Sequence, residues 1–587
     1  MLKVLFKSLV LLAIFIFSDI AMASCFPLSP ADSSFFKPDQ YRSIANIHAF
    51  GQYDNVCSRF NFSKSPQIVN FDFGLPSRLN SFYPLSHANE LKDSLKAVSK
   101  LFFMLGSKRE QILLLDHVQR LSIGSRLFVG YHNLVSEGFY KNSFARSKNF
   151  IIGADNYSRV FDCYFSLTMH KGEFNEFGGI SDSANIVGMS KSELAQLSVF
   201  LSSDKRLNKE SIASYRQRIL VYGGNYDSSN FKLNLNSSFD IFVSKSSYTG
   251  EGSSLFYNNV FLDSSITVDT LGYKGYKASS DLSFSFNGAS LFVGSRFLSV
   301  DTRIMNMRSG FMDVIPFIGS SFKHDSLSIA FEYSHVVSNS YRNNMTELSF
   351  LGSKAFNSSI VNSFILGLSS SSLPAPFLFY NYTSNHYAWE NSFTTFTNFN
   401  RAFGTINILG NSVLLSANLL AFKNRYFLNE FSVPVMSNAH ESTFTASVEL
   451  NQDCGEFYIS GIFLVNSSNS ASLPVPDWQS ELRLSWRHSF FNSALKAEVG
   501  MSGVYTDSWL APAYNPALGS FYLQNNFKSE GFPVLNAFAN MGISSATVFL
   551  KMERLNYGFS DIAYYLHPGY SAPPNTLKFG VLWNLKN

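Results

Sequence analysis

Residues 481–502 read ELRLSWRHSFFNSALKAEVGMS, and apolar and polar side chains alternate along both halves of this stretch. A period of two is the period of a β-strand whose two faces meet different environments. Residues 491–493 interrupt the alternation with Phe-Asn-Ser, so we expect a short turn there and a β-hairpin overall. The polar face of this hairpin would carry Glu481, Arg483, Arg487, Lys496 and Glu498.

The same alternation recurs through most of the chain. Segments of about ten residues, separated by clusters of Gly, Asn, Asp and Ser, follow one another from about Ala97 to the end. At ~9–11 residues per strand, this length predicts roughly 18–24 antiparallel strands, and an even number is expected. We interpret residues 369–372, a run of serines before Leu-Pro-Ala-Pro, as a turn. The clearest strand segments are residues 231–236, 327–334, 444–451, 457–463 and 577–585.

Two further features decide what these strands build. Past the first residues we find no stretch of 18 apolar residues, so a spanning helix is excluded, and only a closed barrel would satisfy every backbone group in lipid. Aromatic residues, 16% of the chain, gather at strand ends as membrane girdles require. A secreted sandwich, solenoid or propeller is the alternative, but we find no repeat of fixed length, and unpaired charges rarely face a dry core. The expected fold class is all-β, a transmembrane antiparallel β-barrel.

The beginning of the chain resembles an export signal. Lys3 and Lys7 precede an apolar run, and residues 21–23 read Ala-Met-Ala, a small-x-small cleavage site. The expected organisation is a signal peptide over 1–23, an irregular periplasmic segment over 24–96 and the barrel over 97–587. Residues 22–25, Met-Ala-Ser-Cys, also loosely resemble a lipobox, which leaves open a lipidated Cys25.

Charge and cysteine content exclude several partners. Without residues 1–23 the chain has 44 basic and 41 acidic residues, a net charge of +3, which is too near neutrality for a nucleic-acid partner. The four cysteines, Cys25, Cys57, Cys163 and Cys454, form no CxxC pair and predict no metal cluster. A Cys25–Cys57 disulfide in the periplasm and two unrelated small residues are both open interpretations.

Several short motifs carry a family resemblance. Residues 513–516, 521–524, 532–538, 548–553 and 567–574 near the end, and 74–77, 105–111, 136–140 and 177–181 near the start, resemble the putative-porin family of Bacteroidetes-type outer membranes. This resemblance implies a β-barrel channel in the cell outer membrane and no catalytic residues. The chain departs from the family pattern at Phe177, where Asn is usual, and in its non-aromatic last residue.

A channel of this kind acts through the charge and width of its water-filled lumen. The inward charges of the alternating strands are therefore the candidate pore-lining residues. A lining of mixed sign predicts a weak ion preference, and the alternative is that these charges are solvated or paired and have no selective role. The candidates are Arg126, Arg216, Arg218, Glu332, Glu449, Glu481, Arg483, Arg487, Lys496, Glu498 and Lys578.

The segment from His170 to Ser211 is the longest interruption of the strand pattern in the N-terminal half. Residues 190–193, Ser-Lys-Ser-Glu, form a capping box that predicts a short helix. Because long barrel loops can fold into the lumen, we interpret this loop as a constriction or lid, with an ordinary surface loop as the alternative. Its candidate residues are Ser190, Glu193, Lys205 and Arg206.

No enzyme motif accompanies these features. H-E-x-x-H, G-x-S-x-G, P-loop and dinucleotide patterns are absent from the sequence, so we expect no enzyme activity, catalytic residue, cofactor or metal. The sequence favours a porin for passive diffusion of small hydrophilic solutes. A gated or lid-dependent uptake barrel and a structural or adhesive barrel are the alternatives. Expected partners are outer-membrane lipid, the barrel-assembly machinery and the solutes. The sequence leaves the oligomeric state undecided, with a homotrimer as one alternative.

Overall fold

The computed structural model describes residues 96–586 except 182–185, 187, 224–230, 253–255, 359 and 558–564. The first half of its strands comprises β1 (Ala97–Leu105), β2 (Gln111–Ser122), β3 (Ser125–Ser136), β4 (Ala145–Asn156), β5 (Phe161–Asn175), β6 (Lys205–Tyr222), β7 (Phe231–Glu251), β8 (Ile266–Phe286), β9 (Ala289–Ile304), β10 (Met307–His324) and β11 (Leu327–His335). The second half comprises β13 (Thr346–Ala355), β14 (Val361–Leu373), β17 (Thr397–Ile408), β18 (Val413–Leu428), β19 (Pro434–Cys454), β20 (Phe457–Ser468), β21 (Trp478–Phe490), β22 (Leu495–Thr506), β25 (Phe532–Ile543), β26 (Ala546–Glu553) and β29 (Thr576–Lys586). The connections contain α3 (Lys191–Gln196), β12 (Val337–Ser338), α4 (Phe377–Tyr380), β15 (Asn381–Thr383), β16 (Ala388–Glu390), β23 (Ala513–Asn515), β24 (Ser520–Tyr522), β27 (Tyr565–His567) and β28 (Tyr570–Ser571).

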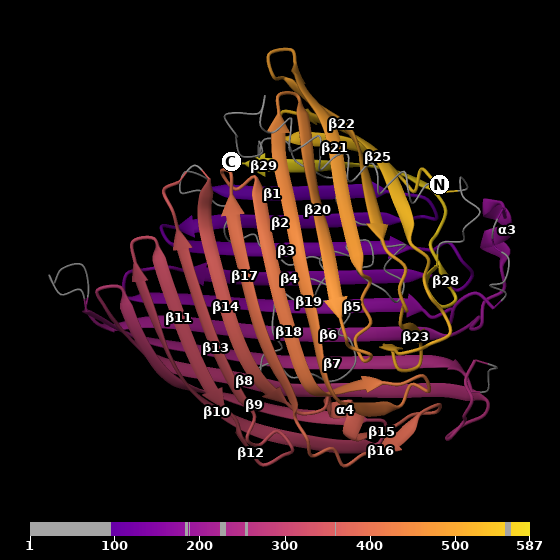
Figure 1. The fold of residues 1–587 in the computed structure, drawn as a ribbon, viewed down its shortest axis with the longest axis horizontal. Helices are drawn as coiled ribbons and strands as arrows, with labels where there is room; N and C mark the ends of the chain where they lie inside the picture. The colour runs from indigo at the N-terminus through magenta and orange to yellow at the C-terminus, as the bar shows by residue number, and fades with distance from the viewer. Residues whose placement is uncertain are drawn as a thin grey trace.

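The long strands form one closed antiparallel β-barrel of 22 strands (Figure 1). Each strand pairs with the long strands before and after it in sequence, and β1 pairs with β29 to close the ring, so the sheet has no free edge. The short β12 only extends the pairing of β11 with β10. The count confirms the even number within 18–24 that the sequence predicts. No helix among the described residues is long and apolar enough to cross a membrane.

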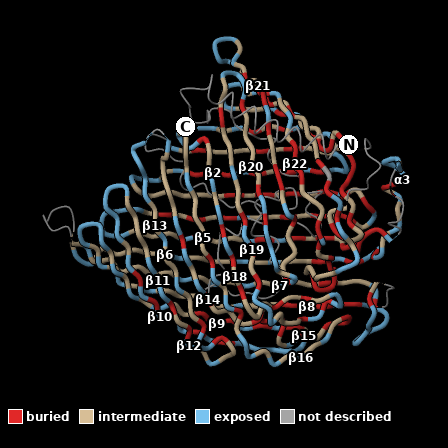
Figure 2. The backbone as a smooth tube through the Cα atoms, viewed as in Figure 1, coloured by how far each residue is buried: buried red, intermediate tan, exposed pale blue. Residues whose placement is uncertain are grey.

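Exposed and buried residues alternate along the strands (Figure 2). In β10, Met312, Val314 and Ile318 are exposed, whereas Asp313 and Ile315 between them are buried. Because the sheet closes on itself, the exposed apolar face is the outer wall, which meets lipid, and the other face is the inner wall. The predicted hairpin over 481–502 is confirmed as β21 and β22, with the turn at 491–494.

The inner wall is not polar throughout. Phe102, Met104, Ile112 and Leu114 of β1 and β2 lie on it and are buried in one apolar cluster, and the rings of Phe102 and Phe549 stack 5.6 Å apart. Their neighbours on the inner wall of β29 include Lys578. The core therefore sits against the inner wall beside the closing strands, so an apolar side chain is not by itself a sign of the lipid face.

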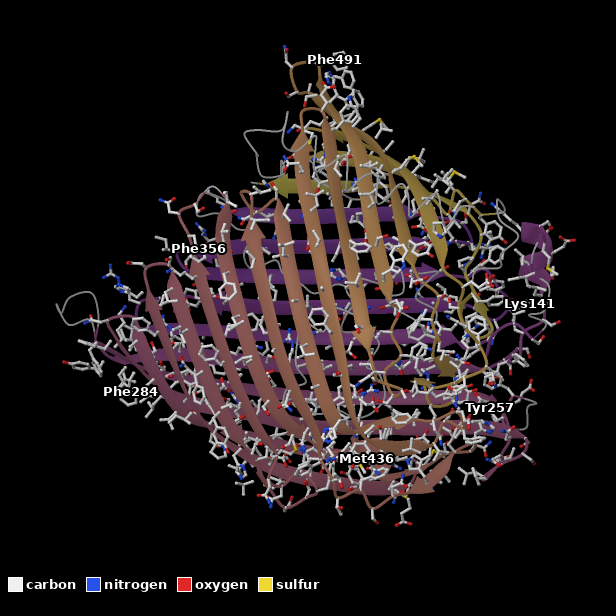
Figure 3. The ribbon with its side chains drawn as sticks, in the orientation of Figure 1. Lys141, Tyr257, Phe284, Phe356, Met436 and Phe491 are labelled. Carbon is white, nitrogen blue, oxygen red and sulfur yellow. The ribbon has the colours of Figure 1, made fainter. Side chains whose placement is uncertain are left out.

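The connections differ in length at the two ends of the barrel. At the short-turn end most strands are joined by tight turns, such as residues 123–124, 287–288 and 544–545. Asn287 and Gly288 have φ angles of 47° and 82°, the left-handed pair that a two-residue hairpin needs. At the long-loop end the connections reach the length of residues 374–396 and 507–531. Side chains at the short-turn end, among them Phe284, Phe356 and Phe491, point away from the barrel (Figure 3).

The structure corrects two sequence predictions. The interruption predicted from His170 to Ser211 is shorter, because β5 continues to Asn175 and β6 begins at Lys205. The serine run 369–372 is not a turn but part of β14, where cross-strand hydrogen bonds override the turn preference of serine. The predicted signal peptide, the lipobox, the Cys25–Cys57 disulfide and the segment 24–96, apart from Lys96, lie outside the described residues.

Candidate functional site

Loops from around the barrel pack together at the long-loop end. We call the described parts of loops 137–144, 176–204, 252–265, 374–396, 507–531 and 554–575 the loop plate. Its elements α4, β15, β16, β23 and β28 gather at one end of the barrel, in the lower right of Figure 1.

Aromatic side chains hold four of these loops together. Tyr140, Phe177, Tyr514 and Tyr570 come from four different connections and form one buried cluster with Ile180. The rings of Phe177 and Tyr570 lie 4.8 Å apart, edge to face. A backbone hydrogen bond from Ile180 N to Gly569 O, 2.8 Å long, joins the same two loops. Aromatic pairs of this geometry stabilise a contact beyond the area that they bury, so the loops form a packed layer.

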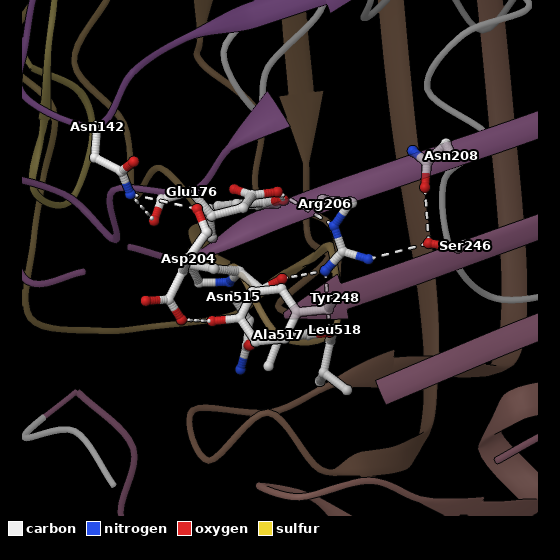
Figure 4. A network of polar contacts seen from close by, with 12 residues as sticks. Asn142, Glu176, Asp204, Arg206, Asn208, Ser246, Tyr248, Asn515, Ala517 and Leu518 are labelled. Atoms are coloured by element: carbon white, nitrogen blue, oxygen red, sulfur yellow. Dashed lines mark hydrogen bonds and ion pairs between the residues drawn. The ribbon is translucent and has the colours of Figure 1, made fainter. Parts of the chain in front are cut away.

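Arg206 lies at the charged centre of the plate (Figure 4). Its Nε donates to Glu176 Oε1 at 3.2 Å, and its Nη2 donates to the carbonyl oxygens of Pro516 and of Ala517, the latter at 3.0 Å. Tyr514 donates its hydroxyl proton to the same Glu176 oxygen at 3.1 Å. Only 5% of the Arg206 side chain is exposed. We call these five residues the Arg206 strap.

The strap crosses the mouth of the barrel. Arg206 belongs to β6, whereas Pro516 and Ala517 belong to the loop between β22 and β25. Around the ring, seven strands lie between β6 and β25 through the β1–β29 seam, and twelve lie between β6 and β22 in the other direction. The two anchors therefore sit on nearly opposite sides of the ring.

A second set of hydrogen bonds extends the plate to the remaining loops. Asn515 donates to Tyr387 Oη at 2.6 Å and to Ser432 Oγ at 2.9 Å, which links three connections. Asn385 N donates to Asp269 Oδ1 at 2.8 Å, and the ring of His386 stacks on Tyr257 with centroids 4.0 Å apart. Burial lowers the pKa of His386, so the imidazole is held neutral inside the layer.

Asp204 is a buried carboxyl group of the plate. It precedes β6, and the hydroxyl of Tyr248 donates to its Oδ1. Burial and, to a smaller extent, the nearby carboxylates of Glu251 and Glu176 raise its pKa to about 6, against the lowering effect of the tyrosine hydrogen bond. Its backbone oxygen accepts from Glu176 N at 2.8 Å and from Asn142 Nδ2 at 3.3 Å. Asp204 therefore joins the strap to the neighbouring loop.

The sequence-predicted pore-lining residues all lie on the inner-wall face of their strands, and most of them are paired there. Arg126 binds Asp155 at 2.8 Å, Arg218 binds Asp162 at 2.6 Å and Glu332 binds Arg296 at 2.6 Å. Arg216 lies over the ring of Tyr164, and Glu449 accepts from Asn451. Glu481 and Lys496 share the inner face with them and are partly buried.

Arg483, Arg487 and Glu498 are brought together in one buried cluster. Glu498 Oε1 lies 3.2 Å from Arg483 Nη2 and 3.1 Å from Arg487 Nε, and Arg487 also binds Asp453 at 2.9 Å. The guanidinium groups of Arg483 and Arg487 lie over the rings of Phe538 and Tyr458, 3.7 and 3.6 Å from their centroids. These charges are fixed in the wall rather than free in solvent.

Lys578 forms a second cluster at the seam. Its side chain is 0% exposed, and Nζ lies 2.8 Å from Glu553 Oε2 and 3.3 Å from Glu110 Oε2. Lys551 Nζ also lies 2.9 Å from Glu553. Sequence reasoning identified Lys578 but not its two carboxylates, because Glu110 lies in the first turn of the barrel, hundreds of residues away, and Glu553 ends the neighbouring strand β26.

The four constriction-loop candidates lie in three different places. Ser190 and Glu193 form the predicted capping box of α3, with Ser190 N donating to Glu193 Oε2 at 2.7 Å. This helix is exposed and stands at the rim (Figure 1). Lys205 is exposed at the start of β6, and only Arg206 reaches the centre of the plate. Sequence reasoning missed its partners Glu176 and Tyr514, which no local pattern connects to it.

The comparisons with known proteins agree with this architecture. A family model described as "Putative porin" matches residues 93–587. None of the curated proteins compared with the chain matches it. Among solved structures, the FrpB iron transporter from Neisseria meningitidis is 10% identical, with a TM-score of 0.58 over 84% of this chain and 81% of that one. BauA, the ferric preacinetobactin receptor from Acinetobacter baumannii, is 11% identical, with a TM-score of 0.56 over 84% and 80%. The copper transporter OprC is 10% identical, with a TM-score of 0.59 over 84% and 80%. At such identities these likenesses show the fold alone.

Proposed function

The chain belongs to the family described as "Putative porin" and is an outer-membrane β-barrel, and from this premise we propose that it conducts small hydrophilic solutes through a mouth that the loop plate opens and closes. Short turns face the periplasm and long loops the exterior in barrels of this class, so the plate would stand on the outer side. The proposal is thus controlled uptake rather than unrestricted diffusion.

The Arg206 strap carries this proposal. It joins nearly opposite sides of the mouth through a buried guanidinium and two backbone carbonyls. Such hydrogen bonds from a charged donor each contribute about 1.5–3 kcal/mol. A contact of this size is strong enough to hold a closed state and weak enough for a bound solute to shift the equilibrium.

The inner wall supports hydrophilic solutes as cargo. Cations and carboxylates alternate on neighbouring strands, as in Arg126 with Asp155 and Arg218 with Asp162. A lining of both signs orients dipolar molecules without excluding either ion type, so the ion preference would be weak. Barrels of similar architecture that are named iron and copper transporters lend support to uptake as the class of function.

Single-channel conductance in planar bilayers tests the strap. We expect the natural protein to be closed most of the time and Arg206→Ala to raise the open fraction at least about tenfold, since the strap loses its charged donor. Arg218→Ala is the matched control, because Arg218 also lies on the inner face of β6 and binds a carboxylate but lies outside the plate. The control should keep the open fraction of the natural protein.

Two outcomes would contradict the proposal. If the natural protein conducts continuously and Arg206→Ala changes nothing, the barrel is an open diffusion pore. If neither protein conducts, and vesicles containing the Arg206→Ala variant do not swell in small sugars, the barrel has a structural or adhesive role instead. In both cases, heat-dependent gel mobility would first establish that the variants are folded.

A further inference from the structure

Four lysines stand side by side on the outer wall. Lys148 of β4 is the register partner of Lys171 of β5, Lys171 is the partner of Lys209 of β6, and Lys209 is the partner of Lys245 of β7. With strands about 4.8 Å apart, the row is roughly 14 Å long. We call these residues the lysine ladder.

The ladder is unfavourable by itself. Like charges placed directly opposite one another on neighbouring strands repel and destabilise the sheet. Lys171 pairs with Glu173, whose carboxylate also attracts Lys148, whereas within the described part of the chain neither Lys209 nor Lys245 has an ion pair. Their side chains point outward on a face where Lys209 and Lys245 are exposed. A surface of this kind is complementary to an external anion.

The position of the ladder indicates where such an anion would come from. On the short-turn side of the ladder, the next outward residues of β4, β5 and β7 are Phe150, Met169 and Val243, which are exposed and apolar. The ladder therefore begins where the lipid-facing band ends, on the side of the long loops. Charged lipid headgroups lie at this level of a membrane, next to the apolar band.

The charges around the ladder strengthen the same conclusion. Further cations share the outer wall of β4 to β8, while the carboxylates on the same wall are fewer. The cations are Arg146, Lys148, Lys171, Lys205, Lys209, Lys245 and Lys274, and the carboxylates are Glu173 and Glu251.

From this geometry we infer that the outer wall of β4 to β7 is a binding site for the phosphate groups of an anionic phosphoglycolipid in the outer leaflet. Each ammonium group would contact a phosphate oxygen, while the acyl chains would lie against the apolar residues below. The bound lipid would remove the repulsion between the lysines. This inference does not depend on solute transport.

Native mass spectrometry of the purified barrel with lipid A tests the site. The triple variant Lys148→Gln, Lys209→Gln, Lys245→Gln leaves the Lys171–Glu173 pair in place. Near a membrane surface each lysine contributes about 1 kcal/mol to the binding of anionic lipid, so we expect the affinity for lipid A to fall on the order of a hundredfold. The matched control is Lys323→Gln, Lys354→Gln, Lys586→Gln, which removes as many exposed lysines at the short-turn end. The control should bind lipid A as the natural protein does.

Three results would overturn the inference. The first is equal binding of lipid A by the triple variant and the control, provided that both melt at the temperature of the natural protein. The second is equal binding of lipid A and of its dephosphorylated form by the natural protein. The third is release of lipid A by excess inorganic phosphate, which would identify a site for the free anion rather than for the lipid.

Discussion

At the scale of single residues, the alternation of the sequence gives the face of a side chain but not its partner. Arg487 and Glu498 are direct register partners, so their pairing follows once the hairpin turn at 491–494 is placed. Arg483 and Asp453 join the same cluster from other positions, and no local pattern connects them. The predicted polar face was therefore right, while the prediction of charges lining a wet lumen missed how deeply Glu498 is buried.

Glu498→Gln should destabilise the barrel. The carboxylate is 1% exposed and lies between two buried guanidinium groups, so its neutralisation leaves buried positive charge without its counter-ion. Breaking a buried pair of this kind costs about 3–5 kcal/mol, and urea unfolding in lipid vesicles measures the loss. Glu332→Gln is the control, because its pair with Arg296 is partly exposed and should contribute less than about 1 kcal/mol. If both variants lost the same free energy of unfolding, the burial of Glu498 would contribute nothing to the stability of the barrel.

At the scale of elements, strands and turns followed from the sequence better than loops did. The hairpin over 481–502 is a local structure, so its period and turn were sufficient to predict it. The prediction of a turn at 369–372 was wrong because pairing with β13 and β17 imposes a strand conformation on these serines. A short stretch of sequence does not include those two partner strands. The prediction of a capping box at Ser190 was right because both of its hydrogen bonds join residues only three positions apart.

Gly288→Ala should weaken the hairpin of β8 and β9. Its φ of 82° belongs to the left-handed region, and an added Cβ would lie 2.0 Å from Lys323 O. Gly455→Ala provides the control, because Gly455 has a φ of 64° but no atom within 4 Å of the added Cβ. Left-handed backbone alone costs about 1–2 kcal/mol in either variant, so Gly288→Ala should lower the midpoint of urea unfolding further than Gly455→Ala does. Equal midpoints would mean that Lys323 moves aside without cost.

At the scale of the whole molecule, the fold class and a range for the strand number were predictable, whereas the exact strand number and the loop plate were not. Arg206 contacts Pro516 and Ala517, which lie 310 and 311 residues further along the sequence. A single sequence contains no signal for contacts of that range. The sequence analysis nevertheless included Arg206 among the candidates of the loop 170–211, because Arg206 lies close to the point where the strand pattern resumes.

The closed state of the plate should depend on pH through Asp204. The pKa of this carboxyl is raised from its ordinary value of 3.8 to about 6, so the folded plate favours the neutral acid. The stabilising effect of the neutral form is complete at low pH and is lost as the pH rises through about 6. We therefore expect the open fraction in planar bilayers to increase as the pH is raised from 3.8 to about 6 and to stay level above that.

Asp204→Asn is the test of this assignment. The amide keeps the size of the side chain and cannot ionise, so the variant should stay closed on both sides of pH 6. A variant that still opens as the pH rises would place the titrating group elsewhere in the plate.

The pairing of β1 with β29 also has a consequence for biogenesis. Because this seam joins residues 98–105 to residues 579–586, nearly the whole polypeptide must be made and held before the cylinder can be sealed. Contacts so distant along the chain form slowly, and until they form two strands expose unpaired backbone groups that invite aggregation. We therefore expect the nascent protein to need a chaperone for most of its journey to the membrane.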